Sequence, residues 1–176
     1  MSRRMRILAG LSAASLLVLG AVPISQATDR LLPHAIQLWD TNQCAPSDAT
    51  DHTLFGMAGP VLQPGHPDVK ILEARPLGLS EGARWRTWIL PVAKDSGWTG
   101  SLGTSAPPAA WPHRVKAAGA TVSSDHPTEL DLEIWPSPGQ RSTSVRGFLV
   151  TYRTTLGITR TVRTPTALTT RTAGCA

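Results

Sequence analysis

The chain has 176 residues, a formal net charge of +5 and two cysteines. Three arginines lie within the first six residues, so the rest carries 14 basic and 12 acidic side chains, a net charge of +2 (14 − 12). The sequence pI of about 10.0 therefore gives little support for nucleic-acid binding. After residue 22, no stretch approaches the roughly 18 apolar residues that a membrane-spanning helix needs.

The first 27 residues have the three parts of a secretory signal peptide. A basic start precedes the apolar run 7–22, and Ser25-Gln26-Ala27 places small residues at the two positions that a signal peptidase reads. We expect cleavage after Ala27 and a secreted single domain over residues 28–176, because 149 residues are enough to bury a core. The alternative is an uncleaved membrane anchor, for which the apolar run is short.

The two cysteines, Cys44 and Cys175, are expected to form one disulfide, because two thiols of an exported chain meet an oxidising compartment. The bridge would close a loop of 131 residues (175 − 44) and tie the start of the domain to its end. It would contribute roughly 5 kcal/mol in the chain-entropy model, and less where the unfolded chain is compact. Two free thiols or an intermolecular bridge are the alternatives.

The first half of the domain has two strand patterns. Residues 28–51 fit either a helical stripe or an edge strand, and we favour an irregular or edge segment. Residues 52–68 are interrupted by glycine and proline, which precludes a long helix. Residues 69–74 and 84–92 have strand character, and we expect them to pair as a hairpin around the turn at 75–82.

The middle of the chain begins with a loop. Residues 96–113 are dense in Gly, Ser, Ala and Pro, which favours a long surface loop over a domain boundary. Residues 114–123 form a further strand pattern, broken by Gly119.

Residues 129–135 alternate strictly between acidic and apolar side chains. This predicts a half-buried strand with its three aliphatic residues on the core face and its three carboxylates on a solvent face. Along one strand face these carboxylates, Glu129, Asp131 and Glu133, lie about 7 Å apart from one to the next. A glycosidase pair is compatible with that spacing, but an ordinary charged solvent face also explains it.

Three more strand patterns follow. Residues 145–153 and 158–164 are expected to form a hairpin, because Gly157 accepts a positive φ in the connection. We expect this hairpin beside the 129–135 strand, and a last strand within 166–172. About seven short strands without a long helix predict an all-β fold, an antiparallel β-sandwich that is immunoglobulin-like in broad architecture.

Tryptophan is the unusual residue of this sequence, because six stand against two Phe and one Tyr. Trp85 and Trp88 lie three positions apart, so on a strand they point to opposite faces, and we expect one outside the core. Exposed indoles stack on sugar rings while arginines hydrogen-bond the hydroxyls. The alternative is that tryptophan fills a core that has few other aromatic residues. The candidate binding residues are Trp88, Trp98, Trp111, Arg84 and Arg86.

Catalytic and metal motifs find little support. Residues 78–82 match G-x-S-x-G, but a hydrolase needs Ser80 between a strand and a helix, and a strand pattern follows. A turn is the simpler interpretation. The five histidines show no H-x-H or H-x-x-x-H spacing, so we expect no metal and no cofactor.

The sequence therefore predicts an exported, non-catalytic module that binds an extracellular or cell-wall polysaccharide. A protein-interaction or structural module that uses a basic C-terminal sheet is the alternative, and an extracellular serine hydrolase is a remote third. The basic sheet would carry the arginines of the acid-free tail: Arg141, Arg146, Arg153, Arg160, Arg163 and Arg171.

Overall fold

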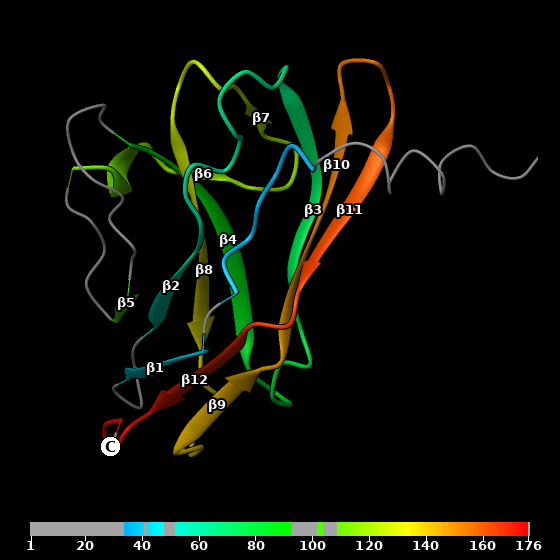
Figure 1. The fold of residues 1–176 in the computed structure, drawn as a ribbon. Coiled ribbons are helices and arrows are strands. Elements are labelled where there is room, and N and C mark those ends of the chain that lie inside the picture. Colours follow the sequence, from blue (N-terminus) through cyan, green and yellow to red (C-terminus); the bar gives the residue numbers. More distant parts are fainter. Residues whose placement is uncertain (1–33, 41, 48–51, 93–101, 104–108, 176) are drawn as a thin grey trace, which may run out of the picture.

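The structure, a computed structural model, describes residues 34–40, 42–47, 52–92, 102–103 and 109–175 (Figure 1). This part of the chain is all-β, with one short turn of 3-10 helix, and none of its helices is long or apolar enough to cross a membrane. The predicted signal peptide, residues 1–27, lies outside it. The elements are β1 (Asn42–Pro46), β2 (Thr53–Ala58), β3 (Val69–Leu77), β4 (Arg84–Pro91), β5 (Leu102–Gly103), η1 (Trp111–His113), β6 (Val115–Lys116), β7 (Thr121–Val122), β8 (Thr128–Trp135), β9 (Ser142–Val145), β10 (Gly147–Thr154), β11 (Thr159–Thr164) and β12 (Ala167–Arg171).

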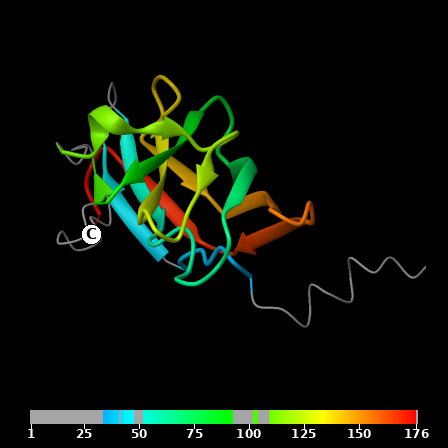
Figure 2. The same cartoon turned by 90° about the horizontal axis from the view of Figure 1, so that it is seen from above.

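The strands form a sandwich of two sheets with a third sheet at one end. One layer has the strand order β5-β2-β8-β4-β6, and the other has the order β11-β10-β3-β7. A three-stranded sheet, β1-β12-β9, lies across the lower end in Figure 1. Figure 2 views the same layers from above. All pairings are antiparallel except β1 with β12. The predicted fold class, an all-β sandwich, is confirmed.

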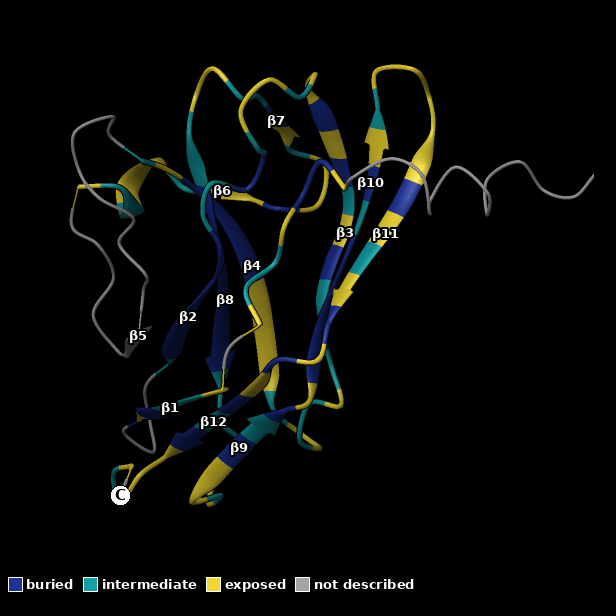
Figure 3. Ribbon diagram, in the orientation of Figure 1, coloured by how far each residue is buried: buried dark blue, intermediate teal, exposed yellow. Residues whose placement is uncertain are grey.

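The core lies between the two large sheets. The apolar residues of β8 and the alternate residues of β10 are buried in one cluster, so the period-2 pattern of each strand places one face inward. Each such side chain contributes roughly 1.5–3 kcal/mol through burial. Figure 3 shows β2 and β8 as the most continuously buried strands. The inward residues of β8 and β10 are Leu130, Leu132 and Ile134 on β8 and Phe148, Val150 and Tyr152 on β10.

The predicted hairpin near the end of the chain is confirmed. Strands β10 and β11 pair from Phe148 with Thr164 to Arg153 with Thr159. Gly157 has a φ of 80° in their connection, and its N–H donates to the carbonyl of Thr154 at 2.9 Å. The predicted last strand is also present, as β12.

The predicted hairpin between residues 69–74 and 84–92 is wrong. Strand β3 pairs with β10 and β7, whereas β4 pairs with β8 and β6 in the opposite layer. The turn between them crosses from one sheet to the other, and the Thr87 hydroxyl donates to the carbonyl of Ala74 at 3.1 Å. Alternation of side chains determines which face of a strand is buried but not which strand lies beside it.

The predicted position of β8 beside the β10–β11 hairpin is wrong for the same reason. β8 pairs with β2 and β4 in the other layer. The pattern over 114–123 is broken at Gly119, as predicted, and the break is larger than a bulge. Gly119 has a φ of 92°, and the short strands before and after it, β6 and β7, belong to different layers.

The predicted disulfide between Cys44 and Cys175 is present, with a Cα–Cα distance of 5.8 Å and a sequence separation of 131. Cys44 lies in β1, and Cys175 follows β12, its parallel neighbour. The bridge therefore links β1 to the segment that follows β12, at one edge of the three-stranded sheet.

Replacement of both cysteines by alanine is expected to lower the free energy of unfolding by about 2–5 kcal/mol, because the unfolded chain regains the entropy of a long loop. Urea unfolding followed by tryptophan fluorescence measures this difference. The unmodified protein in reducing agent is the matched control and should unfold at the same urea concentration as the double variant. An unfolding midpoint equal to that of the oxidised protein would contradict the stabilising role of the bridge.

Candidate functional site on strands β4 and β8

The outward face of the five-stranded sheet carries Arg84, Arg86 and Trp88 of β4 and the three carboxylates of β8. In the register of β4 and β8, Arg84 lies opposite Trp135, Arg86 opposite Glu133, and Trp88 opposite Asp131. Alternation directs these side chains away from the apolar core, because Leu132 and Ile134, which alternate with them on β8, lie in it. Strand β4 forms here because Trp, Thr and Ile favour extended backbone.

The three carboxylates of β8 are buried, so the predicted solvent face is wrong. Glu129 and Asp131 are 0% exposed and Glu133 is 4% exposed. β8 is the central strand of its sheet, so both of its edges are paired. Its outward face lies beside Trp88 of β4, whose ring makes an edge-on contact with the ring of Trp111 in η1, with the two centroids 6.1 Å apart. Strand periodicity separates an acidic face from an apolar one, but it does not show whether another segment covers the acidic face.

Glu133 is held by two neighbouring side chains. The indole N–H of Trp88 donates to Glu133 Oε2 at 2.6 Å, and His52 Nε2 lies 3.7 Å from Oε1. His52 also stacks on Trp111, with ring centroids 6.5 Å apart and planes at 3°. A buried carboxylate is costly unless it is hydrogen-bonded, so these contacts stabilise the burial of β8.

Arg114 packs on both indoles and, with His52 and Trp111, covers the buried Trp88 and Glu133. Its guanidinium lies 4.9 Å from the ring centroid of Trp88 and 4.3 Å from that of Trp111, and Nη1 donates to the carbonyl of Trp111 at 2.8 Å. Trp88 is only 8% exposed. Two of the proposed sugar-binding indoles therefore serve as packing and hydrogen-bonding groups here.

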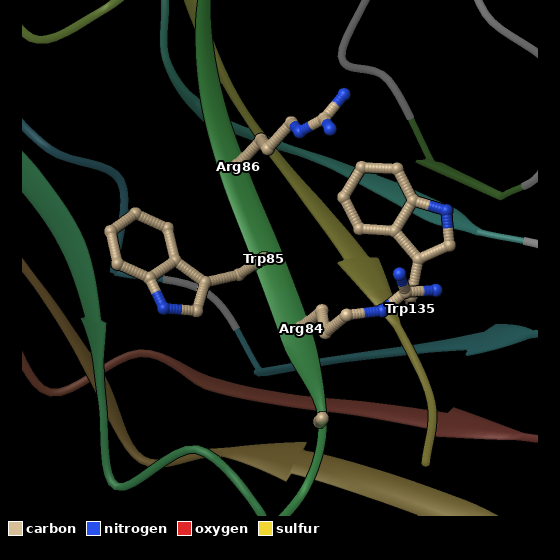
Figure 4. Close-up of a pocket in the computed structure, with 5 residues that line it drawn as sticks. Arg84, Trp85, Arg86 and Trp135 are labelled. Carbon is tan, nitrogen blue, oxygen red and sulfur yellow. The ribbon is translucent and has the colours of Figure 1, made fainter. Parts of the chain in front are cut away.

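A second group of side chains lies at the solvent-exposed start of β4. Trp85 is 40% exposed, and the guanidiniums of Arg84 and Arg86 lie 5.9 and 5.2 Å from the ring centroid of Trp135. With Ala83 these four side chains line an open hollow of about 560 Å³. Figure 4 shows Trp85 on one side of β4, with both arginines and Trp135 on the other. We call this group the β4 surface.

The β4 surface contains two of the five binding residues that the sequence suggested, Arg84 and Arg86. Trp88 is buried, Trp111 is partly exposed and packs against it, and Trp98 lies outside the described residues. The sequence correctly predicted that Trp85 or Trp88 lies outside the core, but the exposed indole is Trp85. The useful signal was local: Trp85 lies between two arginines just after a turn, whereas Trp88 leads into an apolar run.

Trp135 could not be assigned to this surface from the sequence. Its contacts with the two arginines require the pairing of β4 with β8, which the alternation of side chains does not specify.

The G-x-S-x-G segment joins two strands. Ser80 Oγ accepts the backbone N–H of Ser144 at 2.9 Å, and the N–H of Ser80 donates to the carbonyl of Ser144 at 3.0 Å. The hydroxyl thus fastens the turn to β9. Within the described ranges, no group of three His, Cys, Asp or Glu side chains is placed to hold a metal ion.

Trp88→Phe is expected to lower the free energy of unfolding by about 2–3 kcal/mol, because it leaves Glu133 buried without its indole donor. Trp85→Phe, three residues away on the same strand, is the matched control and should change stability by less than about 0.5 kcal/mol. Chemical denaturation of both variants measures the difference. Equal stabilities would show that the Trp88–Glu133 hydrogen bond does not support the fold.

Comparison with known proteins identifies no family for this chain. No family model and no curated protein matches the chain. Among solved structures, the chain is similar to the ASH / PapD-like domain of human CEP192 (PapD-like domain 7), with 12% sequence identity over 82% of this chain and 91% of that chain and a TM-score of 0.37. A likeness at this level carries no argument about ligands or partners.

Proposed function

We propose that the protein is a secreted, non-catalytic binding module for an extracellular or cell-wall polysaccharide, and that the β4 surface is its contact site. The observation that carries the proposal is the exposed indole of Trp85 at the rim of an open hollow that also holds Arg84 and Arg86. This site replaces the one that the sequence suggested around Trp88 and Trp111.

The chemistry of the β4 surface suits a sugar. The flat face of an indole packs against the C–H face of a pyranose, and it gains free energy from the apolar area removed from water, about 25 cal/mol per Å². A guanidinium presents several N–H donors in a fixed plane, which suits hydroxyl and carboxylate oxygens of a polymer.

The two arginines are also arranged in advance of binding. Neither Arg84 nor Arg86 forms an ion pair with a carboxylate of the described chain, and both guanidiniums lie against the ring of Trp135. Their donors therefore remain available, while the ring restricts their side-chain motion. Such restriction reduces the entropy that a ligand must remove when it binds.

Trp85→Ala is expected to weaken binding to an insoluble wall polysaccharide about tenfold, which corresponds to about 1.4 kcal/mol. Depletion of the protein from solution by increasing amounts of polymer measures the affinity, and a shift in tryptophan fluorescence reports contact with the indole. Leu156→Ala is the matched control, because Leu156 is 83% exposed on the β10–β11 connection and lies outside the β4 surface.

The outcomes separate clearly. A loss that is confined to Trp85→Ala supports the proposal. An equal loss in both variants would indicate a nonspecific effect of removing exposed apolar area, and no retention of the unmodified protein on any polysaccharide would end the proposal.

A second candidate function is a protein-interaction or structural module, and the outward face of the four-stranded sheet favours it. Arg153 and Arg163 are exposed on β10 and β11, and Lys70 lies opposite Arg153 on β3. The carboxylate of Glu73, on the same sheet, is paired with Arg75 at 2.8 Å. This face is therefore basic, although the tail arginines do not share one sheet. Arg160 is buried, and Arg171 belongs to the three-stranded sheet.

If this face binds an anionic partner, Arg153→Gln with Arg163→Gln should abolish retention on an anionic polymer at low salt, because it removes two exposed positive charges. Retention of the unmodified protein should fall as salt rises, because salt screens contacts between surface charges. Retention measured at two salt concentrations tests this, with Arg84→Gln plus Arg86→Gln as a control of equal charge change. Retention that both pairs reduce equally would argue against a specific basic face.

A further inference from the structure

The start of β4 has an open backbone edge. β6 pairs with β4 only at Trp88 and Ile89, and the last bond on this side runs from the N–H of Ala117 to the carbonyl of Thr87 at 3.0 Å. Alternate residues of a strand direct their N–H and C=O groups to the same edge, so Trp85 presents its backbone groups on the side where Thr87 meets β6. No strand of the described chain pairs with Trp85 on that side.

Two hollows adjoin this open edge. The first is the hollow of the β4 surface, and the second, of about 220 Å³, is lined by Trp85, Arg86, Thr87, Lys116 and Ala118. Trp85 and Arg86 line both. An extended ligand along the edge would therefore contact the indole on one face of β4 and the two guanidiniums on the other, as their directions in Figure 4 show.

The length of the open edge limits what can pair with it. Of the β4 residues before Thr87, only Trp85 directs its backbone N–H and C=O outward, since Arg84 and Arg86 direct theirs towards β8. The edge can therefore add a peptide of two or three residues. A strand from a folded protein would require a longer run of backbone bonds to bind by edge addition.

The charges around the edge favour carboxylates. Arg84 and Arg86 form no ion pair with the described acidic residues, and Lys116, opposite Trp88 on β6, is exposed beside the second hollow. Carboxylates bind guanidinium groups through short, charge-assisted hydrogen bonds. A neutral glycan would leave these three cations without a counter-charge.

Resting on the proposed function, we infer that the glycan bound at the β4 surface carries short acidic peptides, as peptidoglycan does. The sugar packs on the indole of Trp85. The peptide lies along the open edge, exchanges hydrogen bonds with the backbone of Trp85, and places its carboxylates on Arg84, Arg86 and Lys116.

The test compares insoluble peptidoglycan, the same polymer after enzymatic removal of its peptides, and chitin as a neutral glycan. The unmodified protein is expected to bind the intact polymer at least tenfold more tightly than the stripped polymer. Arg84→Gln with Arg86→Gln should bring the ratio of these two affinities close to one. The ratio is the readout, because the two guanidiniums also contact the sugar and their loss weakens binding to both polymers. Arg153→Gln with Arg163→Gln, which removes the same charge from the opposite sheet, should keep the preference.

A pair of variants at position 85 isolates the backbone contact. Trp85→Ala and Trp85→Pro both lack the indole, but only proline lacks the N–H that faces the open edge. Trp85→Pro is expected to bind the intact polymer about threefold to tenfold less tightly than Trp85→Ala, with equal binding to the stripped polymer. Urea unfolding of both variants confirms that they remain folded, and the arginine variants decide the inference if proline unfolds the strand.

Each outcome has a separate meaning. Equal affinity for intact and stripped polymer would overturn this inference and leave the proposed function intact. Binding to none of the three polymers would overturn the proposed function itself. If the released peptides alone competed as well as the intact polymer, the sugar contact would be excluded and the site would be a peptide site.

Discussion

The arrangement of this protein depends on one buried hydrogen bond, from the indole N–H of Trp88 to the carboxylate of Glu133. Glu133 lies on the central strand of the five-stranded sheet, with apolar core on one side of that strand and carboxylates on the other. Burial of a carboxylate without a partner costs several kcal/mol, so this face requires donors and a cover. Trp88 supplies the donor, and His52, Trp111 and Arg114 complete the layer around it.

This constraint determines which tryptophan is free for other roles. Trp88 lies beside Glu133, and its loss would leave that buried carboxylate without its indole donor. Trp85 lies three residues earlier on the same strand, so it points to the opposite side and reaches solvent where the strand begins. The division between structural and exposed indoles thus follows from strand geometry together with one acidic residue on the neighbouring strand.

The sequence allowed the fold class, the disulfide, the β10–β11 hairpin and the break at Gly119 to be predicted, because each depends on local pattern or on a count of two cysteines. Pairing between distant strands could not be predicted, since β3 and β4 have the periodicity of a hairpin and lie in opposite layers. The burial of the acidic face of β8 could not be predicted either, because it depends on residues 52, 88, 111 and 114, which come together only in the folded chain. Arg84 and Arg86 were predicted as binding residues together with Trp88, but the exposed indole beside them is that of Trp85. Trp135 could not be added to them from the sequence, because its position depends on strand register.

The shortness of β6 has a further consequence, for self-association. A long open strand edge invites a second copy of the same chain to pair with it and start an aggregate. Here β6 covers β4 as far as Thr87, and the remaining edge is bounded by Arg84 and Arg86. Two copies that met at this edge would bring four guanidiniums together over a single pair of residues, and their repulsion opposes that contact. The charges that we propose attract a carboxylate ligand therefore also keep the protein from polymerising through its own edge.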